Sequence, residues 1–426
     1  MNTRLRSNRP IRKGTAFPAL PRVLLALGVM LGAFPMAADD EIPTPTERPS
    51  VATLPPIGDH WLWVPDRLLG HSLLFDGDNG EVLGMIDSPL LLTPQVPIVA
   101  RDRREIYSVD VGYARGNRGE RIDFLTIYDL DTLAFKAEIV FPTRAANGNT
   151  AIAYSSRLGP RFLGVFNQFP ATSVSILDLD ARHFVEEIGV AGCAGIYPID
   201  DHRFASLCGD GTVAVVELTA EGHQAGISHS EKFFDTLEDP VFTSAGRLGR
   251  RWVFVSFQGR VLEVDFSGAT PRIKPAWSIF GEDGGSGPSG WRPGGLQLVA
   301  IHAPSRRLFV VMHEGGPGSH KDAGPEIWVF DLDARKRVAR IEPPPLAASF
   351  LGGRLGIESD SFGFKLLDWI LPADTVHSIT VSQDASPLLF MRNAEFGAIG
   401  VVDPDSGKAL RILNEAGLFG PTLGVP

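Results

Sequence analysis

The sequence has few cysteines, no long hydrophobic run and no excess of positive charge. It holds 2 cysteines among 426 residues, and neither belongs to a CxxCH haem-attachment motif. Its longest apolar run covers residues 23–34, whereas a helix needs about 20 residues to cross a bilayer. The 40 basic and 50 acidic residues give a net charge of −10. These features argue against covalent haem, a membrane anchor and binding to nucleic acid.

The first 38 residues have the features of a secretory signal peptide. They contain basic residues and no acidic residue, and the apolar run 23–34 is followed by Ala38, after which we expect cleavage. Ala33 and Ala37 are alternative cleavage sites. The basic region has no adjacent arginine pair, which favours the general secretory route. We therefore expect a periplasmic protein with a mature net charge near −16 and an N-terminal extension over residues 39–58.

Glycine and proline are abundant, with 46 and 33 residues, and they divide the chain into short β-type segments. A pair of such segments recurs seven times, and the second member always ends in an acidic residue followed by a turn. These acidic residues are Asp76, Asp129, Asp178, Glu217, Asp265, Asp331 and Asp403. An aspartate at such a turn can accept hydrogen bonds from the backbone amides just after it. Further strands follow or precede several of the pairs.

This recurrence predicts an all-β fold, a seven-bladed β-propeller of four-stranded antiparallel blades over residues 59–426. A pair of β-sandwiches is the alternative, but it does not require seven repeats. Residues 281–290 are expected to form a flexible surface loop.

An insertion at residues 343–374 interrupts the pattern before the last blade, and residues 365–371 within it are expected to form a short amphipathic helical turn. The insertion either docks on a partner or folds back on the propeller. The apolar residues that would dock are Phe362, Phe364, Trp369 and Ile370.

Cys193 and Cys208 lie fifteen positions apart in a chain that we expect to be exported. Because exported proteins form disulfide bonds readily, we favour a disulfide between these two residues. Two buried free thiols and metal ligation are the alternatives.

Three short motifs resemble known binding sites but depart from them in position, composition or spacing. Residues 209–214, GDGTVA, resemble the start of a dinucleotide-binding loop, yet they lie between two predicted strands. The alternating acids of residues 76–80 lack the terminal glutamate of a calcium loop. His313, Glu314 and His320 do not have the H-E-x-x-H spacing of a zinc site. We expect the first two motifs to be hairpin turns. We expect no catalytic, cofactor-binding or metal site in this chain.

Six longer segments, which follow one another over most of the chain after His60, carry a different signal. They are GEVLGMID (80–87), ARGNRGERIDFLTIYDLDTLAF (114–135), GCAGIYPIDDHRFASLCGDG (192–211), GWRPGGLQLVAIH (290–302), MHEGGPGSHKDAGPEIWVFDLDARKRVARI (312–341) and ITVSQDASPLLF (379–390). Together they resemble the heavy subunit of the tryptophan tryptophylquinone amine dehydrogenases. The MHEGGPGSHK and EIWVFD segments look closer to the aromatic amine branch, whereas WRPGG and VSQD are also similar to the methylamine branch.

The resemblance implies a seven-bladed propeller and pairing of Cys193 with Cys208. It also implies that the tryptophan tryptophylquinone is carried by a cysteine-rich small subunit, in an assembly of two heavy and two light chains. Such an enzyme oxidises primary amines to aldehydes and ammonia and passes electrons to a blue copper protein or a cytochrome. The isolated heavy chain is then expected to be inactive.

One feature of the resembled family lies on the heavy chain, an aromatic residue of the first blade that lines the substrate channel. Here the corresponding segment, VPDRLLGHSLLFD, is shorter, and the position falls near Leu68 or Leu69. No aromatic residue is present there, which leaves the substrate preference open. A diverged stand-alone propeller that serves as a binding scaffold is the alternative, and a propeller enzyme such as a lactonase or hydrolase is a third hypothesis.

Overall fold

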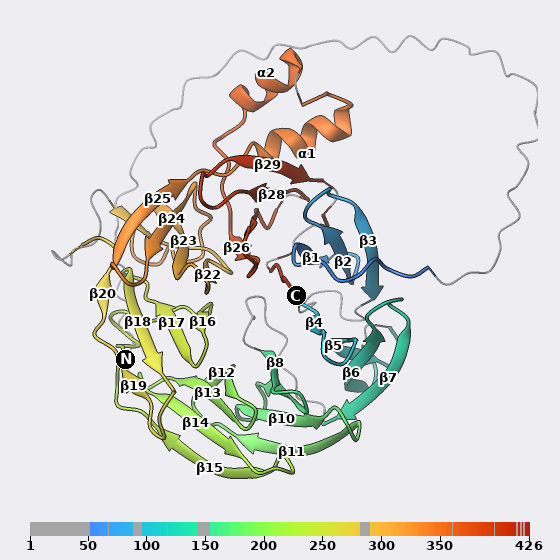
Figure 1. The fold of residues 1–426 in the computed structure, drawn as a ribbon, viewed down its shortest axis with the longest axis vertical. Coiled ribbons are helices and arrows are strands. Elements are labelled where there is room, and N and C mark those ends of the chain that lie inside the picture. Colours follow the sequence, from blue (N-terminus) through green and yellow to red (C-terminus); the bar gives the residue numbers. More distant parts are fainter. Residues whose placement is uncertain are drawn as a thin grey trace, which may run out of the picture. The chain divides into compact units, whose positions relative to one another are not determined.

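The computed structural model describes residues 52–426, except 67, 88–95, 117, 143–153, 282–289, 360, 396, 415, 418–419 and 421. The predicted signal peptide, most of the predicted N-terminal extension and most of the predicted loop at 281–290 lie outside the described residues. The described strands form seven antiparallel sheets that follow one another around a ring (Figure 1). This arrangement confirms the predicted seven-bladed β-propeller.

The first four blades are built from strands that pair in chain order. Blade 1 contains β1 (Trp61–Asp66), β2 (His71–Asp76) and β3 (Val82–Asp87). Blade 2 contains β4 (Ile98–Ala100), β5 (Glu105–Tyr113), β6 (Arg121–Asp129) and β7 (Phe135–Phe141). Blade 3 contains β8 (Ser155–Leu158), β9 (Phe162–Asn167), β10 (Ser173–Asp178) and β11 (His183–Gly189). Blade 4 contains β12 (Cys193–Asp200), β13 (Arg203–Cys208), β14 (Val213–Leu218) and β15 (Gln224–His229).

The last three blades follow the same plan, with one extra short strand in each of blades 5 and 6. Blade 5 contains β16 (Gly246–Leu248), β17 (Arg251–Val255), β18 (Arg260–Asp265), β19 (Arg272–Ile273) and β20 (Trp277–Ser278). Blade 6 contains β21 (Trp291–Pro293), β22 (Val299–His302), β23 (Arg307–Glu314), β24 (Glu326–Asp331) and β25 (Lys336–Ile341). Blade 7 contains β26 (Ser378–Val381), β27 (Leu389–Arg392), β28 (Ile399–Val402) and β29 (Ala409–Leu413).

The C-terminal residues complete blade 1 and close the ring. The Trp63 N–H donates to the Gly424 carbonyl at 2.7 Å, and the Gly424 N–H donates to the Trp63 carbonyl at 3.0 Å. Arg392 of blade 7 is fully buried, and its guanidinium donates to the carbonyls of Pro65 and Ala416 at 3.1 and 3.0 Å. The first and last blades are therefore joined by both backbone and side-chain hydrogen bonds.

The recurring acidic residues cap the turns that follow them, as predicted. In six of the seven, a carboxylate oxygen accepts the backbone N–H two residues downstream at 2.7 to 3.0 Å: Asp76, Asp129, Asp178, Asp265, Asp331 and Asp403. Glu217 is the exception, because the Thr219 hydroxyl accepts the amides of Glu221 and His223 instead. The repeat seen in the sequence is thus a repeated local hydrogen bond.

The hydrophobic core is divided into clusters that lie between neighbouring blades. Leu62 and Val64 of blade 1 share a cluster with Phe390 and Val401 of blade 7. The same arrangement joins the other neighbouring blades. Burial of apolar surface on both sides of each sheet is the main favourable term that holds the ring together.

The insertion at residues 343–374 contains two helices, α1 (Leu346–Leu355) and α2 (Phe362–Ile370). Helix α2 corresponds to the expected helical turn at 365–371 but begins three residues earlier, whereas α1 was not expected. Leu346 of α1 is buried in the core of the propeller, so this part of the insertion folds back. Figure 1 shows α2 outside the ring. Among the described residues, no helix is long and apolar enough to span a membrane.

Candidate functional site

The meander of each blade places its turns on two opposite faces of the ring. We call one the loop face: it carries the turns between β1 and β2, β5 and β6, β9 and β10, β13 and β14, β17 and β18, β23 and β24, and β27 and β28, together with the connections between blades. We call the opposite one the turn face: it carries the remaining turns, including those capped by the recurring acidic residues.

Leu68 and Leu69, the predicted channel residues, lie on the loop face in the turn between β1 and β2. Their backbone N–H groups donate to Asp66 Oδ1 at 2.7 and 3.0 Å. Asp66 is buried, whereas the leucine side chains are 53% and 66% exposed. A buried carboxylate therefore fixes the backbone of this turn while both side chains project toward solvent. Their role in a substrate channel stays a prediction.

Other large apolar side chains are also exposed on the loop face. Phe169, between β9 and β10, is 70% exposed, and Leu237, in the connection from β15 to β16, is 89% exposed. These two residues add to the apolar side chains that the loop face exposes.

A pocket of about 490 Å³ opens on the loop face between blades 5 and 6. Phe257, Phe280 and Trp291 form aromatic walls, and Arg292 and His320 also line it. The His320 ring stacks on Phe257, with ring centroids 4.3 Å apart and an interplanar angle of 19°. Burial lowers the pKa of His320, which favours the neutral imidazole. Concave aromatic surfaces with a few polar groups are typical of small-molecule sites.

His313, Glu314 and His320 do not come together as a metal site. His313 is buried on β23, and its Nε2 lies 2.8 Å from the Ser319 hydroxyl. Glu314 is exposed at the end of the same strand. Across the ranges that the structure describes, no group of three or more His, Cys, Asp or Glu is placed to hold a metal ion.

Trp291 and Trp328 of blade 6 stack on each other. Their ring centroids lie 5.5 Å apart. Trp328 is buried, its Nε1 donates to Glu326 at 2.6 Å, and the Arg337 guanidinium lies 4.2 Å from its ring centroid. Trp328 makes the contacts of a core residue, whereas Trp291 is partly buried and also lines the pocket between blades 5 and 6. Because the Trp328 ring is buried and its indole nitrogen is bound by Glu326, this pair does not fit a quinone cofactor built from two tryptophans.

Cys193 and Cys208 form a disulfide bond, as predicted. They face each other directly on β12 and β13, and both are buried. The GDGTVA motif follows as the turn between β13 and β14, which confirms a hairpin in place of a nucleotide loop. The acidic motif at residues 76–80 is likewise the turn between β2 and β3.

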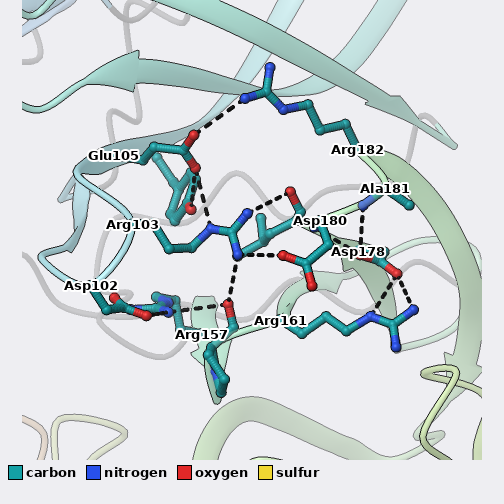
Figure 2. A network of polar contacts seen from close by, with 12 residues as sticks. Asp102, Arg103, Glu105, Arg157, Arg161, Asp178, Asp180, Ala181 and Arg182 are labelled. Atoms are coloured by element: carbon teal, nitrogen blue, oxygen red, sulfur yellow. Dashed lines mark hydrogen bonds and ion pairs between the residues drawn. The ribbon is translucent and has the colours of Figure 1, made fainter.

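The turn face carries a different chemistry, because arginines there link blades 2, 3 and 4 to the blade that follows each of them. Arg103 of blade 2 donates to Asp180 Oδ1 at 2.5 Å and to the Leu179 carbonyl at 3.0 Å, both in blade 3 (Figure 2). Two further arginines reach the following blade in the same way: Arg161 to the Ala220 carbonyl at 2.9 Å and Arg203 to the Gly268 carbonyl at 3.1 Å. These hydrogen bonds hold neighbouring blades together.

Glu105 lies at the centre of the joint between blades 2 and 3 and is 4% exposed. It accepts the Tyr107 hydroxyl at 2.7 Å and lies 3.1 Å from Lys136 Nζ and 3.3 Å from Arg182 Nη2. Burial alone raises the pKa of Glu105, but these donors together outweigh it and hold the pKa below its usual value. A carboxylate with this many partners is a structural joint and not a free acid or base.

His60 makes the corresponding joint between blades 1 and 7. Its Nδ1 lies 2.7 Å from Asp78 Oδ1, and its Nε2 lies 3.2 Å from the Ser386 carbonyl and 3.3 Å from Asp384 Oδ1. Burial lowers the pKa of His60, but the two carboxylates outweigh it and raise the pKa above 6.5. The loop face thus carries Leu68, Leu69, Phe169 and Leu237 and the pocket between blades 5 and 6, whereas ion pairs and hydrogen bonds join neighbouring blades on the turn face.

A profile of the methylamine dehydrogenase heavy chain family matches residues 67–344. The chain belongs to the methylamine dehydrogenase heavy chain family. It is 27% identical over 392 residues to the heavy chain of Methylorubrum extorquens, covering 89% of this chain and 86% of that protein. It is 28% identical over 353 residues to the heavy chain of Paracoccus versutus, covering 81% and 73%. These heavy chains carry the methylamine name and do not confirm the expected closeness to the aromatic amine branch.

Solved structures agree with the propeller fold of this heavy-chain family member. Dihydro-heme d1 dehydrogenase NirN in complex with DHE has a TM-score of 0.51 at 15% identity, covering 89% of this chain and 77% of that chain. A functionally unknown protein from Desulfotomaculum acetoxidans has a TM-score of 0.50 at 12% identity, covering 86% and 98%. At such low identity these likenesses show the fold alone.

Proposed function

We propose that this chain is the large, non-cofactor-bearing subunit of a periplasmic quinoprotein amine dehydrogenase. The observation that carries the proposal is the heavy-chain profile match over residues 67–344, which supports an amine dehydrogenase subunit. The enzyme oxidises primary amines to aldehydes and ammonia. Its tryptophan tryptophylquinone is carried by a cysteine-rich small subunit, in an assembly of two heavy and two light chains, and its electrons pass to a blue copper protein or a cytochrome.

The loop face is the surface that we propose for the small subunit. Its exposed side chains, including Leu68, Leu69 and Phe169, are apolar, and such residues contribute most when a partner removes them from water. The turn face offers charged groups that already satisfy one another. In this proposal the heavy chain covers the cofactor of its partner, excludes water from it and sets the width of the channel through which the substrate enters.

We propose that Leu68 and Leu69 take part in substrate selection. Both side chains are smaller than an aromatic residue, so an entrance bordered by them would be wider than one lined by a phenylalanine ring. A wider apolar entrance admits longer or bulkier primary amines, since selection by an apolar wall depends on the volume that it leaves free.

Co-expression with a cysteine-rich small-subunit gene from the same operon tests the proposal. We expect a co-purifying complex with quinone absorbance and amine-dependent reduction of a dye. Leu69→Asp should weaken the complex at least tenfold by placing a charge in the interface. Phe135→Asp is the matched control, because Phe135 is 63% exposed but lies on the outer strand β7. A chain that captures no small subunit under these conditions contradicts the proposal.

The second candidate is a diverged stand-alone periplasmic propeller that acts as a binding scaffold. The pocket between blades 5 and 6 favours it, because its walls and the Arg292 guanidinium together suit a small aromatic anion. Absence of a cysteine-rich small reading frame beside the gene, together with saturable binding of such an anion, would support the scaffold over the amine dehydrogenase.

A further inference from the structure

The aromatic walls of the pocket between blades 5 and 6 are held in place by the core. The Phe257 ring packs against Phe242, which is 7% exposed, with ring centroids 4.5 Å apart. The rings of Phe280 and Trp291 both pack against Trp328, which is 2% exposed, at centroid distances of 5.9 and 5.5 Å. The walls therefore keep their positions without a ligand. A pocket that is formed in advance loses little conformational freedom on binding, which favours affinity.

Two nitrogen-bearing side chains also line this pocket without a partner. In the part of the chain that the structure describes, the Arg292 guanidinium makes no ion pair and its Nε makes no hydrogen bond. Nδ1 of His320 likewise makes no hydrogen bond there. Arg340, which also approaches the Trp291 ring, already donates to Glu326 Oε2 at 2.6 Å. Arg292 is therefore the arginine of this pocket that is free to bind an anionic group of a ligand.

A carboxylate is the anionic group that suits Arg292. The planar guanidinium presents N–H groups that match the two oxygens of a carboxylate, and such charge-assisted hydrogen bonds are stronger than neutral ones. Glu238 also lines the pocket and repels an anion, but it is exposed, so water weakens its effect more than that of the partly buried Arg292. An ammonium group in the pocket would instead meet the like charge of Arg292.

The volume and the walls define the rest of the ligand. A volume of about 490 Å³ lies in the range of small-molecule sites, roughly 300–1,000 Å³. The rings of Phe257, Phe280 and Trp291 offer stacked or edge-to-face contacts to a further aromatic ring. We propose that this pocket binds small aromatic carboxylates, whose ring lies between the aromatic walls and whose carboxylate binds Arg292.

The proposed ligand site is complete within this chain. The proposal therefore deepens the scaffold candidate by assigning its ligand to named residues, and it does not depend on the amine dehydrogenase role. Binding is expected for the isolated chain, without a small subunit.

Isothermal titration calorimetry of the purified mature chain with three related compounds tests this proposal. Indole-3-acetate carries the carboxylate, indole-3-ethanol replaces it with a hydroxyl group, and tryptamine replaces it with an ammonium group. We expect saturable binding of indole-3-acetate at one site per chain. Indole-3-ethanol should bind at least about tenfold more weakly, because it loses the charge-assisted hydrogen bonds, and tryptamine should bind more weakly still.

Variants separate the role of the charge from that of the rings. Arg292→Met should weaken indole-3-acetate at least about tenfold and leave indole-3-ethanol within about twofold of the parent. Trp291→Leu should weaken both compounds, because it removes a wall that both rings contact. Arg335→Met is the matched control: Arg335 is exposed in the turn between β24 and β25 on the turn face, so its loss removes the same charge away from the pocket. It should leave both affinities unchanged.

The outcomes decide both the site and its ligand class. Absence of saturable binding of indole-3-acetate at millimolar concentration overturns the proposal. Tryptamine that binds as tightly as indole-3-acetate also overturns it, as does an equal effect of Arg292→Met on the acid and the alcohol. If Arg292→Met fails to fold, as judged by its thermal midpoint, the three compounds on the parent chain still decide the question. Capture of a small subunit is measured separately, so failure here leaves the amine dehydrogenase proposal standing.

Discussion

Replacing Arg103 by methionine should loosen the joint between blades 2 and 3 that Figure 2 shows. The exposed fraction of the Asp180 side chain is 58%, so its ion pair with Arg103 contributes at most about 1 kcal/mol. The bond from Arg103 to the Leu179 carbonyl is partly buried and has a charged donor, which makes it worth about 1.5–3 kcal/mol. Methionine keeps the aliphatic stem, and Glu105 keeps its other partners. We expect the free energy of unfolding to fall by about 3 kcal/mol.

Equilibrium unfolding in urea, followed by tryptophan fluorescence, measures this loss. Asp180→Asn is the matched control, because it removes only the exposed partner and should cost less than about 1 kcal/mol. Equal losses from the two variants would show that the ion pair, and not the bond to Leu179, stabilises the joint. A loss below about 1 kcal/mol for Arg103→Met would refute the reasoning.

Three further predictions concern other joints and the channel. Since carboxylates raise the pKa of His60 above 6.5, its stabilising charge is fully present below that value and is lost as the pH rises through the raised pKa. His60→Gln should flatten this dependence in thermal midpoints measured from pH 5 to 9, and an unchanged slope would contradict it. Removing the disulfide with Cys193→Ala/Cys208→Ala should lower the free energy of unfolding by about 3 kcal/mol, as seen in urea; an unshifted midpoint would count against it. In the complex, Leu69→Phe should reduce kcat/KM for phenylethylamine about tenfold relative to methylamine, and equal effects on both amines would argue against a channel role.

The propeller could be predicted because its signal is local and repeated. Asp178, for example, accepts the backbone amides two and three residues downstream, so a few consecutive residues determine the turn. Six copies of that turn, and a seventh acidic residue at the same place in blade 4, then indicate a closed ring of seven blades. The disulfide was predictable because the chain offers only one pair of cysteines.

The joints and the pocket could not be predicted, because they join residues that are far apart in the sequence. Arg103 meets Leu179 from 76 positions away, and the sequence around either residue does not identify the other. The pocket residues Phe257 and His320 come from different blades, and their contact depends on how blades 5 and 6 pack. The family resemblance suggested a partner, but only the topology shows that Leu69 shares a face with this pocket.

The helices of the insertion illustrate the limits of local signals. Helix α1 includes Gly352 and Gly353, which have low helix propensity, and its formation depends on the burial of Leu346 in the propeller core. Helix α2 begins earlier than expected because the Ser361 hydroxyl accepts the Phe364 N–H at 3.1 Å. A serine at this position is a common start signal, so this boundary was available in the sequence.

Separation and recombination of the subunits tests the central claim most directly. The complex purified from the periplasm would be split into this chain and its small partner, and amine-dependent dye reduction would be measured for each alone and for the mixture. We predict that this chain alone is inactive and lacks quinone absorbance, and that the recombined complex oxidises primary amines at the original rate. Amine oxidation by this chain alone, or a recombined mixture without amine-dependent activity, would contradict its role as the heavy subunit.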